Sequence, residues 1–309
     1  MAKEITDGVI EIDTMLGGWQ HLTAGFVITG DAPVLIETGS QSSFEAVVTE
    51  LNSIGLGPND LAGVAVTHIH LDHAGAVGDI AKVFPNATIY VHPVGARHLI
   101  DPSRLVNSAS MVYGDLLDSL YGRLEPTESS RVKVLEDRER INVSANRYLE
   151  AIDSPGHAKH HLGFFDSNSG TVFSGDAIGV LIPEIGVLRP ATPPPDFDLE
   201  LVLSSLKKFL AYNPSGIAMA HYGLFPNSEE LILNAEDVVN RWAFVAEQAF
   251  TNNQDIEAAL EAAFRFETDD KDPQVVEMFD TLNGMHANAN GLRRWLEKRA
   301  QNTDQHSHG

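Results

Sequence analysis

An α/β fold followed by an all-helical C-terminal region is the fold class that this sequence of 309 residues predicts. Two observations predict it. Between residues 61 and 93 a strand, a loop, a helix and a second strand follow one another, an order typical of a sheet covered by helices. Beyond Pro226 the strand pattern disappears. We therefore expect an α/β domain over residues 1–227, with a helical insertion near residues 103–124, and a helical region over residues 228–309.

The first 60 residues change from strands to a helix. Three short strand-like segments, GVIEIDT, GFVITG and PVLIET, are separated by glycine and proline turns. From Ser42 onward, apolar residues follow the i, i+3, i+4, i+7 spacing of a helix with one buried face. Ser42 and Glu45 form a candidate capping box, and Gly55 suits the end of this helix.

The middle of the chain alternates between the two kinds of element. LAGVAVTH predicts a buried strand, AGAVGDIAKVF a helix and ATIYVHP the next strand. After the helical residues 103–124, strand-like segments resume at RVKVLE, YLEAIDS, HLGFFDS and TVFSGD. The stretches AGFVITGDAPVLIETG and LGFFDSNSGTVFSGD share a strand, turn, strand, glycine layout, which is a weak indication of internal duplication.

The last third begins with an apolar, proline-rich stretch over residues 180–197, which predicts an irregular loop. A helix near residues 199–210 and a last strand, GIAMAH, follow it. Further helices are expected to begin near Ser228, Asp255, Asp272 and Asn290. The tail QNTDQHSHG is expected to be disordered.

Composition restricts the function. The formal net charge of −22 disfavours binding to a nucleic-acid backbone. Because the chain has no cysteine, disulfides, thiolate metal sites and cysteine nucleophiles are excluded. The N-terminus has no apolar signal region, and no stretch approaches about 18 uninterrupted apolar residues. We expect a cytoplasmic protein that does not bind a membrane.

Four candidate metal ligands lie within six residues, at His68, His70, Asp72 and His73. Alternate residues at a strand end point the same way, so His68 and His70 can reach one metal ion. The turn at Leu71 delivers Asp72 and His73 to a neighbouring position. A chance match to this pattern is expected in about one such chain per thousand.

Three further polar residues follow strand-like segments, where catalytic groups are usually mounted. They are His157 in SPGHA, Asp176 in SGDA and His221 in AHYG. Five imidazoles and two carboxylates are enough for two metal ions that share a bridging group. Two such ions can hold a bridging hydroxide as nucleophile, so no protein nucleophile is required.

In its motif order the chain resembles the metallo-β-lactamase-fold superfamily over residues 1 to about 227, through THIHLDHAG, SPGHA, SGDA and AHYG. The resemblance points to the glyoxalase II and lactonase-like branch without identifying a subfamily, and it implies an αββα sandwich with the site at one edge of the sheets. It also implies a role for each candidate ligand. The first metal would be bound by His68, His70 and His157, and the second by Asp72, His73 and His221. Asp176 would bridge the two metals, and Asp72 would orient the water bound to them.

We therefore expect a binuclear metal-dependent hydrolase acting on a small ester, thioester, lactone or related acyl substrate. Zinc is the default for these ligands, and iron or manganese fits the same donors. A small-molecule phosphodiesterase and a diiron redox or oxygen-binding protein are the alternatives. Related diiron proteins carry Glu where His70 stands, which favours hydrolysis. A non-catalytic protein with structural metals or none, and a homo-oligomer formed through the C-terminal helices, are further hypotheses.

Several residues have two open interpretations. His160 and His161 could line the pocket and move protons, or could support the ligands. Tyr222 could polarise a substrate carbonyl or belong to the core. Arg189 could bind a substrate anion or pair with an acid such as Glu184. Residues 103–124 and the loop from residue 180 could wall the pocket or pack against the neighbouring domain.

Overall fold

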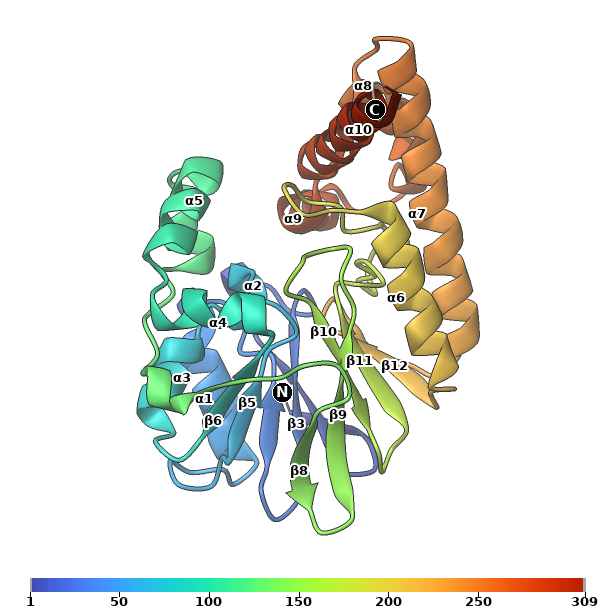
Figure 1. Ribbon diagram of the computed structural model, residues 1–309. Coiled ribbons are helices and arrows are strands. Elements are labelled where there is room, and N and C mark those ends of the chain that lie inside the picture. The colour runs from blue at the N-terminus through green and yellow to red at the C-terminus, as the bar shows by residue number, and fades with distance from the viewer. Residues whose placement is uncertain (1, 308–309) are drawn as a thin grey trace.

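Two facing β-sheets form the centre of the molecule, and helices cover both outer faces (Figure 1). The computed structural model describes residues 2–307, with side chains as far as residue 302. Its four layers are the αββα sandwich implied by the resemblance, followed by a helical C-terminal region, so the predicted fold class is confirmed. Within the described part of the chain, no helix combines the length and apolarity that a membrane span requires.

The first sheet contains seven strands in the order of the chain. They are β1 (Lys3–Thr6), β2 (Val9–Asp13), β3 (Ala24–Ile28), β4 (Val34–Ile36), β5 (Gly63–Ala65), β6 (Thr88–Val91) and β7 (Val132–Val134). Strands β1 to β4 pair antiparallel, and β4 to β7 pair parallel. The helices between the parallel strands are α1 (Phe44–Ser53), α2 (Leu71–Ala74), α3 (Val77–Val83), α4 (Pro93–Ile100) and α5 (Ser103–Tyr113).

The second sheet has six strands and repeats this plan. They are β8 (Arg140–Ser144), β9 (Arg147–Asp153), β10 (Leu162–Asp166), β11 (Thr171–Gly175), β12 (Gly216–Met219) and β13 (Gly223–Phe225). An antiparallel run from β8 to β11 is followed by the parallel pair β11 and β12, which α6 (Leu199–Ala211) connects. The hairpins β3–β4 and β10–β11, whose sequences share a layout, thus occupy corresponding places in the two sheets.

Strand alternation explains why both faces of each sheet are apolar. On β3, Phe26 faces the other sheet while Val27 faces the helices. On β11, Phe173 meets Phe26 between the sheets, with ring centroids 5.2 Å apart, while Val172 packs towards α6. Because successive side chains on a strand point to opposite faces, strands buried on both sides are apolar throughout.

The C-terminal region consists of α7 (Ser228–Thr251), α8 (Ile256–Phe264), α9 (Pro273–Asn283) and α10 (Met285–Ser307). In Figure 1, α7 runs along α6, and α8 and α10 lie at its far end. Apolar residues of α7, α8 and α10 belong to the same buried cluster as Val172 of the second sheet. The described helices after Pro226 therefore share a core with the sandwich, while the division at residue 227 into two domains stays a prediction.

Several details differ from the sequence predictions. The capping box is wrong, because residues 41–43 form a 3-10 turn and the Ser42 hydroxyl donates to the Leu120 carbonyl at 2.6 Å. Strands β1, β8 and β13 were not predicted, and α10 begins five residues before Asn290. The predicted disordered tail is helical as far as Ser307, and residues 308–309 lie outside the described residues. The helical insertion is present as α5 and a π-helical turn at Leu117–Tyr121.

Candidate metal centre

All seven predicted ligands lie together at one edge of the sandwich, just beyond the ends of neighbouring strands. Residues 68–73 follow β5 and enter α2, while His157 follows β9, Asp176 follows β11 and His221 follows β12. Parallel strands end at the same edge of a sheet, which is why segments far apart in the sequence meet here.

The first group comprises His68, His70, His157 and Asp176. Nδ1 of His70 lies 2.9 Å from Nε2 of His68 and 3.0 Å from Nε2 of His157. The second group comprises Asp72, His73 and His221. Their closest approach is 3.2 Å, between Nε2 of His73 and Nε2 of His221, and Oδ2 of Asp72 lies 3.6 Å from both nitrogens.

Asp176 lies between the two groups. Its Oδ1 is 3.2 Å from Nε2 of His73 and 3.4 Å from Nε2 of His221. Its Oδ2 is 3.5 Å from Nε2 of His157 and 3.9 Å from Nε2 of His68. Each carboxylate oxygen therefore faces a different set of imidazoles.

The donor set fits divalent cations. Four tetrahedral ligands at the usual zinc–nitrogen distance lie about 3.3 Å from one another, within the range of spacings found here. Oδ1 of Asp176 is buried and lacks a well-aligned hydrogen-bond donor, although two imidazole nitrogens lie within 3.4 Å. Because a buried unsatisfied acceptor is costly, a cation bound by these side chains would satisfy it.

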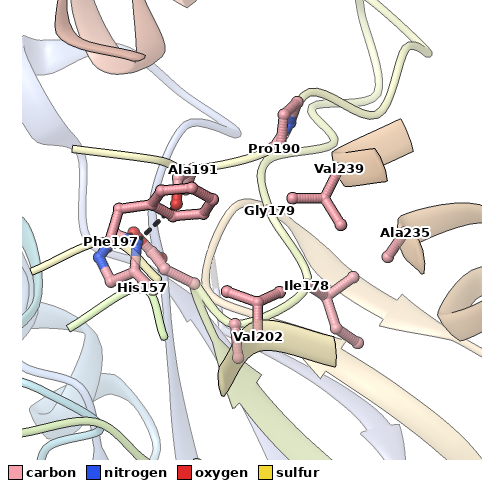
Figure 2. A pocket seen from close by; sticks show the side chains of 11 residues that line it. His157, Ile178, Gly179, Pro190, Ala191, Phe197, Val202, Ala235 and Val239 are labelled. Atoms are coloured by element: carbon pink, nitrogen blue, oxygen red, sulfur yellow. Dashed lines mark hydrogen bonds and ion pairs between the residues drawn. The ribbon is translucent and has the colours of Figure 1, made fainter. Parts of the chain in front are cut away.

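Supporting hydrogen bonds fix four of the five imidazoles. Nδ1 of His157 donates to the Ala191 carbonyl at 3.0 Å, and Nδ1 of His221 donates to the Leu22 carbonyl at 2.8 Å. A carbonyl only accepts, so both Nε2 atoms keep a lone pair that faces the centre. Figure 2 shows the contact between His157 and Ala191. This arrangement is typical of imidazoles that bind metals.

Glu37 supports the other two imidazoles, and the sequence predictions missed it. Its Oε1 lies 3.3 Å from Nδ1 of His73, and it also accepts from the Thr67 hydroxyl. That hydroxyl lies 2.9 Å from Nδ1 of His68, so one carboxylate supports an imidazole in each group. A signal did exist, because Glu37 follows β4 as Asp176 follows β11 in the two stretches of similar layout.

The buried charges shift the pKa values in opposite directions. Burial, followed by the neighbouring imidazoles, holds the pKa of both His68 and His70 well below the usual range. Burial would also lower the pKa of His73, but the charges of Asp176 and Asp72 outweigh it and hold that pKa well above the usual range. Burial would raise the pKa of Asp176, yet His73 and His221 keep it well below its usual range.

His161 lies in a supporting position, while both interpretations of the partly buried His160 stay predictions. His161 is buried, contacts Ser154 through Nδ1 at 2.8 Å and accepts from the Asp176 backbone N–H through Nε2 at 3.3 Å. His160 stacks on His68 with ring centroids 6.2 Å apart, and burial lowers its pKa to about 4.

Arg189 pairs with an acid, as one of its two interpretations expected, but the acid is Asp280 and not Glu184. The Arg189 guanidinium is buried and contacts Asp280 of α9 at 2.5 Å, while Glu184 contacts His21 at 2.8 Å. Tyr222 is directed to Glu11, and burial raises its pKa. Its hydroxyl therefore already has a partner away from the seven ligands.

The two segments that could wall a pocket, the loop from residue 180 and the helical insertion of residues 103–124, have different surroundings. Val180, Ile182 and Ile185 of the apolar loop are buried and pack with Phe279 of α9, which is the packing interpretation. Farther along this loop, residues 190, 191 and 197 line a cavity of about 10 Å³ beside His157, room for about one water (Figure 2). In the helical insertion, the rings of Tyr113 and Tyr121 contact each other at a tilt of 45°, with centroids 4.6 Å apart. Burial raises the pKa of both hydroxyls, and the Asp72 charge adds to this effect.

Comparisons with known proteins agree on one family. The family model described as Metallo-beta-lactamase superfamily matches residues 17–221, more than half of the chain. The chain is 31% identical over 165 residues to the metallo-beta-lactamase fold-containing protein ST1585 of Sulfurisphaera tokodaii, a match covering 52% of this chain and 60% of that protein. It is 27% identical over 164 residues to the "Probable metallo-hydrolase MJ0888" of Methanocaldococcus jannaschii, covering 53% and 70%. The sequence match thus spans less than two thirds of the length of ST1585.

Solved structures share the fold. The crystal structure of ST1585 from Sulfolobus tokodaii has a TM-score of 0.70 at 23% identity, covering 93% of this chain and 98% of that chain. The family protein TTHA1429 from Thermus thermophilus has a TM-score of 0.61 at 18% identity, covering 95% and 94%. Both matches extend over more than nine tenths of this chain, so the shared fold includes most of the C-terminal helical region.

Proposed function

Because the chain belongs to the metallo-beta-lactamase superfamily, we propose that it is a metal-dependent hydrolase with a binuclear centre. Family membership and the histidine and aspartate groups support metal-dependent hydrolysis. The observation that carries the binuclear proposal is the position of Asp176. Its two oxygens face two different sets of imidazoles, which suits a carboxylate shared by two cations.

In this proposal, His68, His70 and His157 would hold the first ion, Asp72, His73 and His221 would hold the second, and Asp176 would be shared by both. When bound, two divalent cations lower the pKa of the hydrolytic water and offset the negative charge that develops on the substrate. Zinc suits these nitrogen and oxygen donors best, with iron and manganese as alternatives.

The protein's own groups determine how water and substrate approach. His70 and Asp72 are the two ligands that retain partial exposure, while the other five are buried. The exposed side of the candidate centre is therefore at His70 and Asp72, and in this proposal the Asp72 carboxylate would accept a hydrogen bond from the hydrolytic water and orient it. Glu37, the Ala191 carbonyl and the Leu22 carbonyl hold their imidazoles in one tautomer.

A small ester, thioester, lactone or related acyl compound is the substrate class that we propose. The sequence suggested Arg189 as a group that could bind an anionic substrate. Because its guanidinium is buried and paired with Asp280, it does not support an anionic substrate. The net charge of −22 also disfavours an anionic substrate. A small-molecule phosphodiester is the second candidate substrate. The third candidate function is a diiron redox role, and metal analysis would distinguish it from hydrolysis because it requires bound iron. A cytoplasmic location and a homo-oligomer formed through the C-terminal helices stay predictions.

Assays of the purified protein against ester, thioester, lactone and phosphodiester panels, before and after chelation, test the proposal. We expect about two equivalents of bound metal, turnover of an acyl substrate, and loss of that turnover on chelation. Activity that is indifferent to the chelator, or protein that binds no metal, would refute it. If the protein turns over phosphodiesters and no acyl compound, the proposed substrate class is a small-molecule phosphodiester instead.

The variant Asp72→Ala gives a second test. We expect it to fold normally and to lose turnover by about 10²-fold or more, because it removes the group that orients the water. Asp237→Ala is the matched control, since Asp237 is exposed on α7 and pairs only with Arg241 among the contacts found in the described chain. Equal rates in wild type and Asp72→Ala would contradict the assignment of Asp72.

A further inference from the structure

The C-terminal helices contact the segment that holds one of the proposed ligands. His157 donates from Nδ1 to the Ala191 carbonyl at 3.0 Å. Its Nε2 is thereby left to face Oδ2 of Asp176, at 3.5 Å, and Nδ1 of His70, at 3.0 Å. The position of the Ala191 carbonyl thus sets both the tautomer and the direction of this ring.

Two buried asparagines of the C-terminal region hold the backbone on both sides of Ala191. Oδ1 of Asn288, on α10, accepts from the Thr192 N–H at 2.7 Å and from the Thr192 hydroxyl at 2.8 Å. Nδ2 of Asn283, on α9, donates to the Pro190 carbonyl at 3.2 Å. Nδ2 of Asn288 in turn donates to Oδ1 of Asn283 at 2.7 Å. The two asparagines therefore form one connected hydrogen-bond network against this segment.

Two further contacts fix the same segment. The Arg189 guanidinium donates to Asp280 at 2.5 Å and to the Asn283 carbonyl at 2.9 Å, and it lies over the Phe279 ring at 4.1 Å. On α10, a Cβ at Gly291 would lie 1.7 Å from the Thr192 carbonyl oxygen, so only glycine permits this close approach. The helix therefore lies directly against residues 189–192.

We infer that α9 and α10 fix the orientation of the His157 imidazole through residues 189–192, with Asn283 and Asn288 as positioning residues. The inference rests on the proposed function in one respect, because it takes His157 as a metal ligand. It makes the C-terminal helices part of the metal-binding apparatus. Loss of such a supporting partner typically weakens metal binding about 10–100-fold.

The test uses the full chain and the variant Asn288→Ala, with Asn290→Ala as the control. Asn290 lies on the same helix, but among the contacts found in the described chain its side chain meets only His286 and Arg293, both on α10. Long-range ¹H–¹⁵N spectra of the metal-free protein report the His157 tautomer and the exchange of its Nδ1 proton. Zn²⁺ titration against a competing chelator reports the affinity for each equivalent.

In Asn288→Ala we expect faster exchange of the His157 Nδ1 proton, mixed tautomers and one Zn²⁺ equivalent bound about 10–100-fold more weakly. Asn290→Ala should match wild type in all three measurements, because its side chain does not reach residues 189–192. An equal loss of Zn²⁺ affinity in both variants would contradict the inference, since it would trace the effect to α10 in general.

Thr192→Val provides a milder variant, because it removes the hydroxyl bonds to Asn288 and keeps the backbone bond. We expect smaller changes, in the same direction, in the His157 tautomer, the exchange of its Nδ1 proton and the Zn²⁺ affinity. If Asn288→Ala does not fold, Thr192→Val provides the test of the inference. Unchanged tautomer and unchanged Zn²⁺ affinities in folded variants would overturn the inference and leave the proposed function standing. A tautomer change in protein that binds no Zn²⁺ would support the orientation of His157 and overturn the proposed function.

Discussion

Glu37 is a buried carboxylate residue whose backbone has a positive φ, two features that are rarely found together. It has a left-handed backbone conformation, with φ of 63°, and the residue is only 2% exposed. Strained backbone of this kind persists only where surrounding contacts hold it, often at a functional site. Here those contacts are the Thr67 hydroxyl and Nδ1 of His73, which connect the carboxylate to both groups of ligands.

We predict that Glu37→Gln weakens Zn²⁺ binding by about 10–100-fold. A neutral amide accepts less strongly from Nδ1 of His73 and removes the negative charge behind that ring. Competitive chelator titration measures the affinity, and Glu229→Gln on the exposed face of α7 serves as the control. An affinity equal to that of wild type would show that Glu37 does not support the metal centre.

The backbone at the end of β11 requires glycine for steric reasons that the sequence motif alone does not show. Gly175, the last residue of β11, has φ of +48°. A Cβ at this position would lie 2.6 Å from both Nε2 of His161 and the Thr67 hydroxyl oxygen. Gly55, after α1, has φ of +87° and open space around its missing Cβ.

We therefore predict that Gly175→Ala lowers the free energy of unfolding more than Gly55→Ala does. Both changes place alanine at positive φ, which costs about 1 kcal/mol. Only Gly175→Ala adds a steric conflict with His161 and Thr67, and it should also displace Asp176 and reduce metal content. Urea unfolding and metal analysis of both variants measure these effects. Equal destabilisation by the two changes would contradict the steric argument.

At the scale of elements, sequence periodicity predicted most helices well. The helix predicted from Ser42 is α1, and Gly55 ends it as expected. The predicted capping box failed because Ser42 contacts Leu120, 78 residues away, instead of its own helix. Strands β1 and β13 were missed because they are short edge strands, whose pairing partners provide most of their stability.

At the scale of the whole molecule, a buried ion pair of the second sheet also reaches the first sheet, at the end opposite the candidate metal centre. Arg147 of β9 contacts Asp166 of β10 through Nε at 2.9 Å and through Nη2 at 2.6 Å. The same guanidinium donates to the carbonyls of Thr29 and Asp7, beside the first sheet. Burial would raise the pKa of Asp166, but Arg147 outweighs it and lowers that pKa.

We predict that Asp166→Asn destabilises the protein by about 3–5 kcal/mol at pH 7, because it leaves a buried guanidinium without its counter-charge. The folded pKa of Asp166 lies below its unfolded value of about 3.9. Its contribution is therefore complete above that value and is lost as the pH falls through the folded pKa. The difference in the free energy of unfolding between wild type and Asp166→Asn should therefore become smaller below about pH 4. Urea unfolding at a series of pH values measures it.

Asp118→Asn is the control, because Asp118 pairs with Arg123 on the exposed insertion. Exposed pairs are screened by solvent, so little change is expected. A destabilisation by Asp166→Asn no larger than that of the control would show that the counter-charge of Asp166 does not stabilise the buried Arg147 guanidinium.

By itself the sequence determined the fold class and brought seven candidate ligands to notice, because periodicity and the spacing of His68 to His73 are local properties. Only the tertiary structure decided which groups support those ligands. The Glu37 carboxylate meets His73 across 36 residues, and Asn288 meets Thr192 across 96. Such partners are ordinary polar residues in the sequence. They acquire a role only when the strand ends and the C-terminal helices are packed at one edge.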